Sequence, residues 1–309
     1  MLVRAMIVAC FVLISSIVQG QCFRPLTDPQ SSNTADWNDL VYMSSDLWQP
    51  GVIERQKIED GLGQINLDFY SVTFKKNSGA DLAATFLQIR KAFPLFAHTS
   101  ASTYGDESSQ YFGPYFETEV GDSYGLANQQ LWNSGVPRGA VMGFVLDNHV
   151  PALAFAATLK GVKIVLEKGD VLVTCAGPSQ IIVSTVQTKA DGYHPVSGNR
   201  GFGLRDNGDG TWTFYTMGAD RQAGVHTDSS PSVPYFGNIA LSLGFPDRGI
   251  PPGSDAVFYA GDKFWRGFFA NLEDYLDQHS MTVKASSFIT NSHRYPYPLS
   301  GGGPQPVPQ

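Results

Sequence analysis

Apolar and polar positions along the chain follow two different periods, which predict strands and helices. Apolar and polar residues alternate along residues 64–75, and this alternation shifts by one position at Ser71. The apolar positions are Ile65, Leu67, Phe69, Val72 and Phe74. This pattern predicts a strand with a bulge near Ser71. Residues 81–94 repeat their apolar positions at helical spacing behind Asp81, a favourable N-cap residue, and Pro94 is expected to end this helix. A second helix is predicted over residues 122–132.

From Gly139 onward the pattern changes to short apolar and β-branched runs separated by Gly, Pro and Asp. The runs "AVMGFVL", "VKIVLE", "DVLVTC" and "QIIVSTVQ" are predicted strands, and "EKGD" is predicted to be a hairpin loop between two of them. Two further runs, "RGFGLR" and "TWTFYTM", flank "DNGDG". Asn-Gly and Asp-Gly pairs favour the backbone twist of tight hairpins, so a hairpin is predicted here.

A long amphipathic helix is predicted over residues 262–279. Its wide apolar stripe is formed by Phe264, Trp265, Phe268, Phe269, Leu272, Tyr275 and Leu276. The chain therefore runs from a strand and a helix through several antiparallel strands to one late helix. This order predicts an α+β fold in which a curved antiparallel β-sheet wraps the C-terminal amphipathic helix.

The two ends of the chain differ from the segment between them. Residues 1–20 combine Arg4, an apolar stretch, and small residues at Val18 and Gly20, a pattern that predicts a signal peptide cleaved after Gly20 and hence a secreted protein. An uncleaved signal anchor is the alternative interpretation. Residues 21–60 are expected to form an irregular and partly helical lead-in, residues 61–294 a single α+β domain, and residues 295–309 a Pro/Gly-rich tail.

Composition and charge narrow the class of partner. The apolar share of 42% supports a real core, and the net charge of −7 argues against nucleic acid or an anionic membrane surface as the main partner. No segment after the first twenty residues is long and apolar enough to predict an integral membrane span. The partner expected from this reasoning is a small molecule.

Of the three cysteines, Cys10 would leave with the signal peptide. In an oxidising compartment the remaining two, Cys22 and Cys175, predict one disulfide between the new N-terminus and the middle of the domain. The alternative is a buried Cys175 in a strand and a free or intermolecular Cys22.

The segment "EKGDVLVTC", followed by "YHPVSGNRGFGLRDNGDGTWTFYTMGADR", resembles the helix-grip superfamily, which includes START and Bet v 1-like domains. The likeness is to the uncharacterised bacterial and plant branch of this superfamily. The residues of this chain at the positions that carry the likeness are His194, Pro195, Gly198, Phe202, Gly210, Trp212, Phe214 and Arg221. The order of the elements matches over residues 65–280, but the amino-acid types match over only about 50 residues. Long inserts at 99–135 and 222–255 depart from the family pattern. It implies a fold with an internal cavity, and it carries over no catalytic residue.

Metal and cofactor chemistry find little support in the sequence. The "DNGDG" segment has oxygen ligands at close spacing, but it lacks the alternating ligands and the late glutamate of a calcium-binding EF-hand loop, so turn chemistry is the simpler interpretation. The six histidines are scattered, without an HExxH motif. We expect neither a metal nor a cofactor.

Four polar residues near the predicted hairpin are candidates for a site. His194 precedes a proline and is either a general base or a residue that holds the loop through a backbone hydrogen bond. Arg200, Asp220 and Arg221 either close the hairpin mouth as an Arg–Asp pair or recognise an anionic head group at the entrance of a cavity.

The leading functional prediction is a secreted protein that binds an apolar or amphipathic small molecule in an internal cavity. Its predicted ligand-binding residues are His194, Arg200, Trp212, Phe214, Tyr215, Arg221 and Phe268. One alternative is a secreted hydrolase or lyase that uses His194 with Asp220 or Tyr215. A further alternative is a structural or interaction protein whose interior is filled by its own side chains.

Overall fold

The computed structural model describes residues 21–26, 28, 33–43, 47, 53–97, 110–116, 122–148, 167–188, 191–227, 230–234, 254–284 and 287–299. For residues 110–116, 122–126, 145–148, 167–168, 224–227, 230–234 and 254–260, apart from Phe258, this description covers the backbone. The predicted signal peptide and most of the predicted tail lie outside the described residues. No helix in the described part is long and apolar enough to cross a membrane.

The first elements in chain order are η1 (Thr34–Trp37), α1 (Asn38–Val41), β1 (Ile53–Arg55), η2 (Ile58–Asp60), β2 (Leu62–Lys75) and α2 (Leu82–Phe96). They are followed by β3 (Gln110–Phe116), α3 (Asp122–Trp132), β4 (Val141–Asn148), β5 (Glu167–Ala176), β6 (Gln180–Thr188), β7 (Val196–Asp206) and β8 (Thr211–Gln222). The last elements are β9 (Gly224–Thr227), β10 (Ser230–Pro234), α6 (Ser254–Gln278) and β11 (Ile289–Tyr295).

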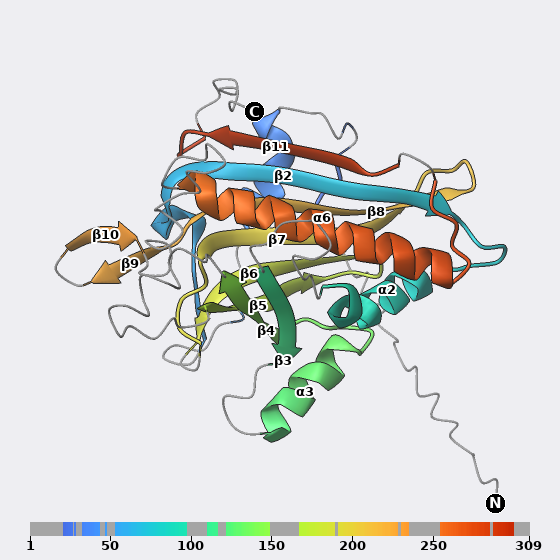
Figure 1. The fold of residues 1–309 in the computed structure, drawn as a ribbon, viewed down its shortest axis with the longest axis horizontal. Helices are drawn as coiled ribbons and strands as arrows, with labels where there is room; N and C mark the ends of the chain where they lie inside the picture. The colour runs from blue at the N-terminus through green and yellow to red at the C-terminus, as the bar shows by residue number, and fades with distance from the viewer. Residues whose placement is uncertain are drawn as a thin grey trace, which may run out of the picture.

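One large antiparallel sheet organises the fold. Its strands lie in the order β11-β2-β8-β7-β6-β5-β4-β3, and β1 pairs with β6 beyond the end of β7. The long helix α6 runs along β2 on one face of this sheet, and the sheet curves around it (Figure 1). The predicted fold class, an α+β fold with a curved antiparallel sheet and a long C-terminal helix, is confirmed.

The face of the sheet that carries α6, here called the helix face, holds an aromatic core. Side chains point to alternate faces of a strand, so Trp212 and Phe214 of β8 share this face with Phe74 of β2. The centre of the core is Phe268 of α6, which is fully buried; its ring lies 5.0 Å from the ring of Phe93. Sequence periodicity alone therefore placed the apolar stripe of α6 correctly.

The opposite face of the sheet is covered by the N-terminal segment, and we call it the strap face. The covering side chains are Phe23, Leu26, Trp37, Leu40, Val41 and Ile58. The predicted disulfide between Cys22 and Cys175 is present and fixes this segment to β5. A Cβ atom at Gly201 would lie 2.5 Å from the ring of Phe23, so only glycine leaves room for that ring on the sheet.

The turn between β7 and β8 confirms the interpretation of "DNGDG" as turn chemistry. The Asp206 carboxylate accepts a hydrogen bond from the amide of Gly208 at 2.9 Å, and the Asp209 carboxylate accepts one from the amide of Thr211 at 3.0 Å. Gly208 and Gly210 have φ angles of 78° and 84°, which glycine adopts without strain. These carboxylates therefore serve as caps of the turn.

Two expectations about the first strand and helix are wrong. Ser71 pairs regularly with Tyr215, and the irregularity in β2 falls between Leu62 and Asn66. Asp81 does cap α2, but Pro94 lies inside this helix, which continues to Phe96. The proline lacks an amide for the carbonyl of Arg90, and that carbonyl instead accepts a hydrogen bond from the Trp132 indole at 2.9 Å. The lost helical bond is thus replaced from α3.

The prediction of a hairpin loop at "EKGD" is also wrong, because all four residues belong to β5 and pair with β4. Gly169 is required inside this strand for packing: a Cβ atom there would lie 2.5 Å from the ring of His194. Of the predicted strand "VKIVLE", residues 162–166 lie outside the described residues. The late helix begins at Ser254, before the start that its apolar stripe predicted.

Candidate functional site

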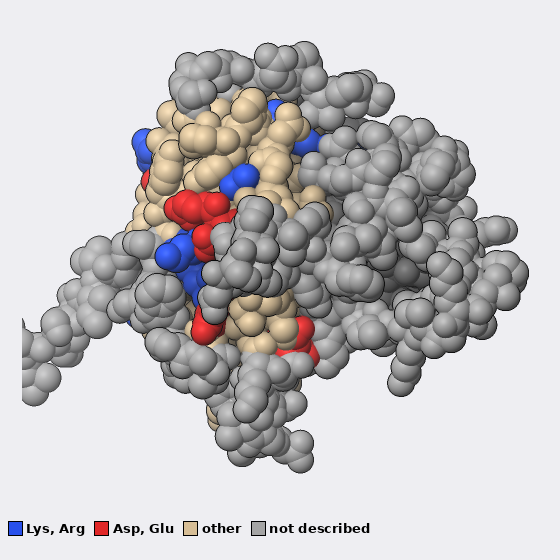
Figure 2. Space-filling view, turned by 90° about the vertical axis from the view of Figure 1, so that its left-hand side faces the viewer, with Lys and Arg blue, Asp and Glu red and all other residues tan. Residues whose placement is uncertain are grey.

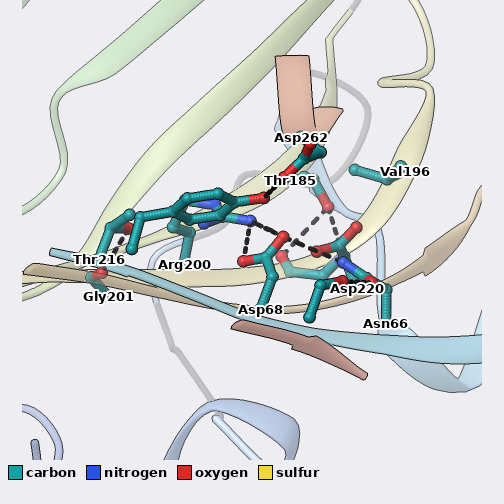
Figure 3. Close-up of polar contacts among 12 residues, drawn as sticks. Asn66, Asp68, Thr185, Val196, Arg200, Gly201, Thr216, Asp220 and Asp262 are labelled. Atoms are coloured by element: carbon teal, nitrogen blue, oxygen red, sulfur yellow. Dashed lines mark hydrogen bonds and ion pairs between the residues drawn. The ribbon is translucent and has the colours of Figure 1, made fainter. Parts of the chain in front are cut away.

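A cluster of polar and charged side chains occupies the helix face beneath the N-terminal half of α6 (Figure 3). In β2 the even-numbered residues Asn66, Asp68 and Tyr70 point to this face, while the odd-numbered ones enter the strap-face core. Register then brings distant strands together: Asp68 lies opposite Gly218 of β8, and Gly218 lies opposite Arg200 of β7. The cluster therefore joins side chains of β2 to side chains of β7 and β8 that follow more than a hundred positions later in the sequence.

Arg200 is the centre of this cluster. Its Nη2 atom donates a hydrogen bond to Asp68 Oδ2 at 2.9 Å and lies 2.7 Å from Asp68 Oδ1. The same nitrogen lies 3.7 Å from Asp220 Oδ2. The guanidinium group also stacks on the ring of Trp265 in α6, 4.2 Å from its centroid. One arginine thus faces two carboxylates and holds the helix against the sheet.

Glycine makes room for these charges. A Cβ atom at Gly218 would lie 2.1 Å from Arg200 Nη2 and 2.5 Å from Asp68 Oδ1. A Cβ atom at Gly198 would lie 2.5 Å from the Cβ atom of Asp220. The local sequence is therefore fitted to the placement of the cluster on the sheet.

Further hydrogen bonds tie the cluster to α6 and β11. Asn66 donates to Asp68 Oδ2 at 3.0 Å and accepts from the Ser292 hydroxyl at 3.1 Å. The Tyr70 hydroxyl donates to Asp262 Oδ1 at 3.0 Å. The second oxygen of Asp262 accepts from Arg266 Nε at 2.8 Å.

Burial changes the acidity of the carboxylates. Loss of solvent, the largest effect, raises the pKa of Asp68, while the neighbouring Arg200 opposes this rise. Burial, reinforced by the negative charge of Asp68, raises the pKa of Asp220 to about 7. Burial and the nearby carboxylates also raise the pKa of Tyr70. At neutral pH, Asp220 is therefore able both to hold and to release a proton.

Some hydrogen-bonding capacity in the cluster is unused. Nη1 of Arg200 is buried and has no hydrogen-bond partner among the described residues. Oδ1 of Asp68 meets Arg200 only as an ion pair. The Asp220 side chain remains 13% exposed. On the side of the molecule where α6 begins, Figure 2 shows charged side chains of both signs close together.

The raised pKa of Asp220 predicts a pH-dependent stability that Asp220→Asn removes. Between the ordinary pKa of an aspartate and pH 7, the folded protein binds more protons at this site than the unfolded chain. The contribution of Asp220 to the free energy of unfolding therefore falls as pH rises through this window, opposite in sign to the contribution of His194, whose pKa is lowered. We expect Asp220→Asn to flatten this dependence and to raise the free energy of unfolding at pH 8 by about 1–3 kcal/mol. Urea denaturation at pH 4.5 and pH 8 measures both effects.

The matched control is Asp274→Asn, on an exposed position of α6, which is expected to leave the pH dependence unchanged. If the difference in unfolding free energy between Asp220→Asn and wild type is the same at both pH values, the prediction is contradicted.

Of the four polar candidates, the structure brings Arg200 and Asp220 together. Arg221 points to the opposite side of β8, where it donates to the carbonyl groups of Ile58 and Gly63 at 3.0 and 2.9 Å. Its guanidinium group stacks 4.2 Å from the ring of Tyr297. These contacts hold the turn before β2.

His194 and Tyr215 lie in surroundings of their own. The His194 backbone pairs with the Gln56 side chain, its Nδ1 atom lies 3.2 Å from the amide of Val196, and burial lowers the pKa of its ring to about 4. Tyr215 lies on the strap face, where its hydroxyl accepts from Gln180 at 2.8 Å. Asp220 and Tyr215 thus occupy opposite faces of β8, and the hydrogen bonds of His194 among the described residues go to Gln56 and Val196. An enzyme that uses His194 stays a prediction.

The three aromatic residues predicted to line a ligand wall lie in the aromatic core. Trp212, Phe214 and Phe268 are each buried and pack against neighbouring rings. Two other members of this core lie near Arg200. Val183, which is 8% exposed, lies opposite Arg200 on the neighbouring strand, and Phe264, which is 7% exposed, packs against Trp265.

Sequence reasoning missed Asn66, Asp68, Tyr70, Asp262 and Trp265 as site residues. The signal was present in β2, because polar residues occupy the phase opposite to Ile65, Leu67 and Phe69. A strand with polar residues at every second position is normally interpreted as having one face exposed to solvent. Only the placement of α6 over that phase shows that these polar residues are buried.

Comparisons with known proteins give little further information. No protein-family model matches the chain, and no curated protein matches it. Among solved structures, the di-domain ARO/CYC StfQ from the steffimycin biosynthetic pathway is similar with a TM-score of 0.33 and 10% identity. The match covers 72% of this chain and 54% of that protein, so the chain spans about half the length of StfQ.

Proposed function

We propose that the protein binds an amphipathic small molecule between α6 and the sheet, with the polar end of the ligand at Arg200, Asp68 and Asp220. The observation that carries this proposal is the burial of this charged cluster beside apolar side chains of the aromatic core. Val183 lies directly opposite Arg200 on the neighbouring strand, and Phe264 precedes Trp265 on α6. A polar recognition group and an apolar wall are therefore adjacent.

The energetics of burial support a functional role for the cluster. Removing an arginine and two carboxylates from water costs several kcal/mol per ion, and well-packed apolar residues of similar volume often stabilise a fold as well or better. The side chains of Arg200 and Asp68 are only 12% and 6% exposed, so both charged groups have lost most of their solvation by water. Buried polar groups of this kind are characteristic of ligand sites, where a few polar atoms orient a mainly apolar ligand.

We also propose that the chain is a member of the helix-grip superfamily, with one domain over residues 61–294, and that it is secreted. The disulfide between Cys22 and Cys175 supports the second proposal, because such bonds persist mainly in oxidising compartments. Mass spectrometry of the exported protein, starting at Gln21, is the measurement that tests secretion and cleavage.

Binding of the neutral apolar dye N-phenyl-1-naphthylamine tests the proposed site. We expect the wild-type protein to bind the dye with a saturable fluorescence increase. Val183→Phe would add bulk directly beside Arg200 and is expected to weaken binding by at least about tenfold. The matched control, Val136→Phe, adds the same atoms at a position that is 48% exposed and is expected to bind as wild type does.

The possible results separate the functional interpretations. Dye binding that Val183→Phe leaves unchanged, in a variant whose circular dichroism is native, would place the dye elsewhere and contradict the proposed site. If wild type takes up no dye and native mass spectrometry of the purified protein shows no bound ligand, a structural or interaction protein with a filled interior becomes the better interpretation.

A further inference from the structure

Arg200 and Asp220 present a hydrogen-bond donor and a proton acceptor side by side. Nη2 of Arg200 is engaged by Asp68 and lies 3.7 Å from Asp220 Oδ2, while Nη1 has no hydrogen-bond partner in the described part of the chain. Asp68 positions the guanidinium group, and Trp265 covers one of its faces. An acceptor atom of a ligand at Nη1 would therefore lie close to the Asp220 carboxylate.

The charges around this pair favour a neutral ligand. The carboxylates that face the space are Asp68 and Asp220 from the sheet and Asp262 from α6, and the arginines are Arg200 from β7, Arg266 from α6 and Arg294 from β11. Three carboxylates thus meet three guanidinium groups. An additional negative charge would be buried without a partner, whereas a neutral carbonyl oxygen can accept from Nη1 at little cost.

We propose that this pair is an acid–base site for an apolar ketone or a related carbonyl compound, in which Arg200 binds the carbonyl oxygen and Asp220 moves a proton at the adjacent carbon. The inference rests on the proposed function, because it assigns chemistry to the same ligand site. It differs from an enzyme based on His194 or Tyr215, since both catalytic groups come from the helix-face cluster.

The proposed reaction is balanced without a further reactant. The Asp220 carboxylate accepts a proton from the carbon next to the carbonyl group, and the C–H bond breaks. Its electron pair forms the C=C bond of an enolate, whose negative oxygen is bound by Nη1 of Arg200. If the protonated Asp220 exchanges its proton with solvent and then protonates the same carbon, the result is hydrogen exchange. If Asp220 delivers the proton to a conjugated carbon, the result is isomerisation.

The acidity of Asp220 suits this role. A general acid–base group is most effective when its pKa lies near the working pH, and burial together with Asp68 raises the pKa of Asp220 to about 7. The glycines at 198 and 218 keep both side chains in place, because a Cβ atom at either position would collide with Asp220 or Arg200. Position and acidity thus favour the same chemistry.

Deuterium exchange into 2-tetralone, an apolar ketone with acidic α-hydrogens, tests the inference. In deuterated buffer near neutral pH, we expect the wild-type protein to accelerate loss of the α-proton NMR signal by about 10²-fold over buffer. Asp220→Asn is expected to lose this acceleration, and Arg200→Lys to reduce it. Asp274→Asn, on the exposed side of α6, is expected to retain it. The wild-type rate should rise with pH through the range near 7 where Asp220 loses its proton.

Displacement of N-phenyl-1-naphthylamine by 2-tetralone separates binding from chemistry. If the dye is bound but the ketone does not displace it, or displaces it without accelerated exchange, the acid–base inference is wrong and the proposed binding function stands. If neither compound binds, the proposed function itself fails. An Asp220→Asn variant that is natively folded by circular dichroism and exchanges as fast as wild type would also overturn the inference.

Discussion

Replacing Phe268 with alanine is expected to lower the free energy of unfolding by about 3–5 kcal/mol. Phe268 is fully buried, and its ring lies within 5.0–5.5 Å of the rings of Phe93, Phe96, Trp265 and Phe269. Because these neighbours come from two helices, the space left by the ring cannot close without moving α2 or α6. Urea denaturation monitored by tryptophan fluorescence measures the loss.

The control for this prediction is Asp274→Ala on the exposed side of the same helix, which is expected to change the stability by no more than about 0.5 kcal/mol. A loss below about 1 kcal/mol for Phe268→Ala would mean that α6 is not packed into the sheet as described. The proposed ligand site would then lose its structural basis.

Removing the disulfide with Cys22→Ser and Cys175→Ser is expected to cost about 2–5 kcal/mol. The bond joins residues that are 153 positions apart, so it restricts a large part of the unfolded chain. It also holds Phe23 over Gly201 on the strap face. We therefore expect faster hydrogen exchange in the covering segment, residues 22–41, as well as a lower urea midpoint.

Reduced wild-type protein is the internal comparison for this variant. It should show the same urea midpoint as the double serine variant, and reductant should not change the variant further. Equal stability of the oxidised wild type and the variant would show that packing alone holds the N-terminal segment on the strap face.

The elements that depend on neighbouring residues were predictable from the sequence. Asp81 caps α2, "DNGDG" closes the β7–β8 hairpin, and the apolar stripe of α6 faces the core, because each signal lies within a few turns of chain. The errors at Ser71, Pro94 and "EKGD" occur where a distant partner decides the local structure. At Pro94, for example, the Trp132 indole replaces the missing hydrogen bond.

The candidate site was predictable only in part for the same reason. Arg200 and Asp220 were identified because they flank a recognisable hairpin, and register places Arg200 opposite Gly218. Asp68 and Asp262 gave no such local signal. Their role depends on the pairing of β2 with β8 and on the position of α6, which no pattern in residues 62–75 specifies.

The position of β2 in the sheet affects how the chain is made in the cell. This strand bonds to β8 on one side and to β11 on the other, and both follow it late in the sequence. During synthesis its apolar side chains emerge from the ribosome well before either neighbour exists. A truncated chain that ends before β8 would thus leave both edges of this long strand unpaired, a condition that favours aggregation.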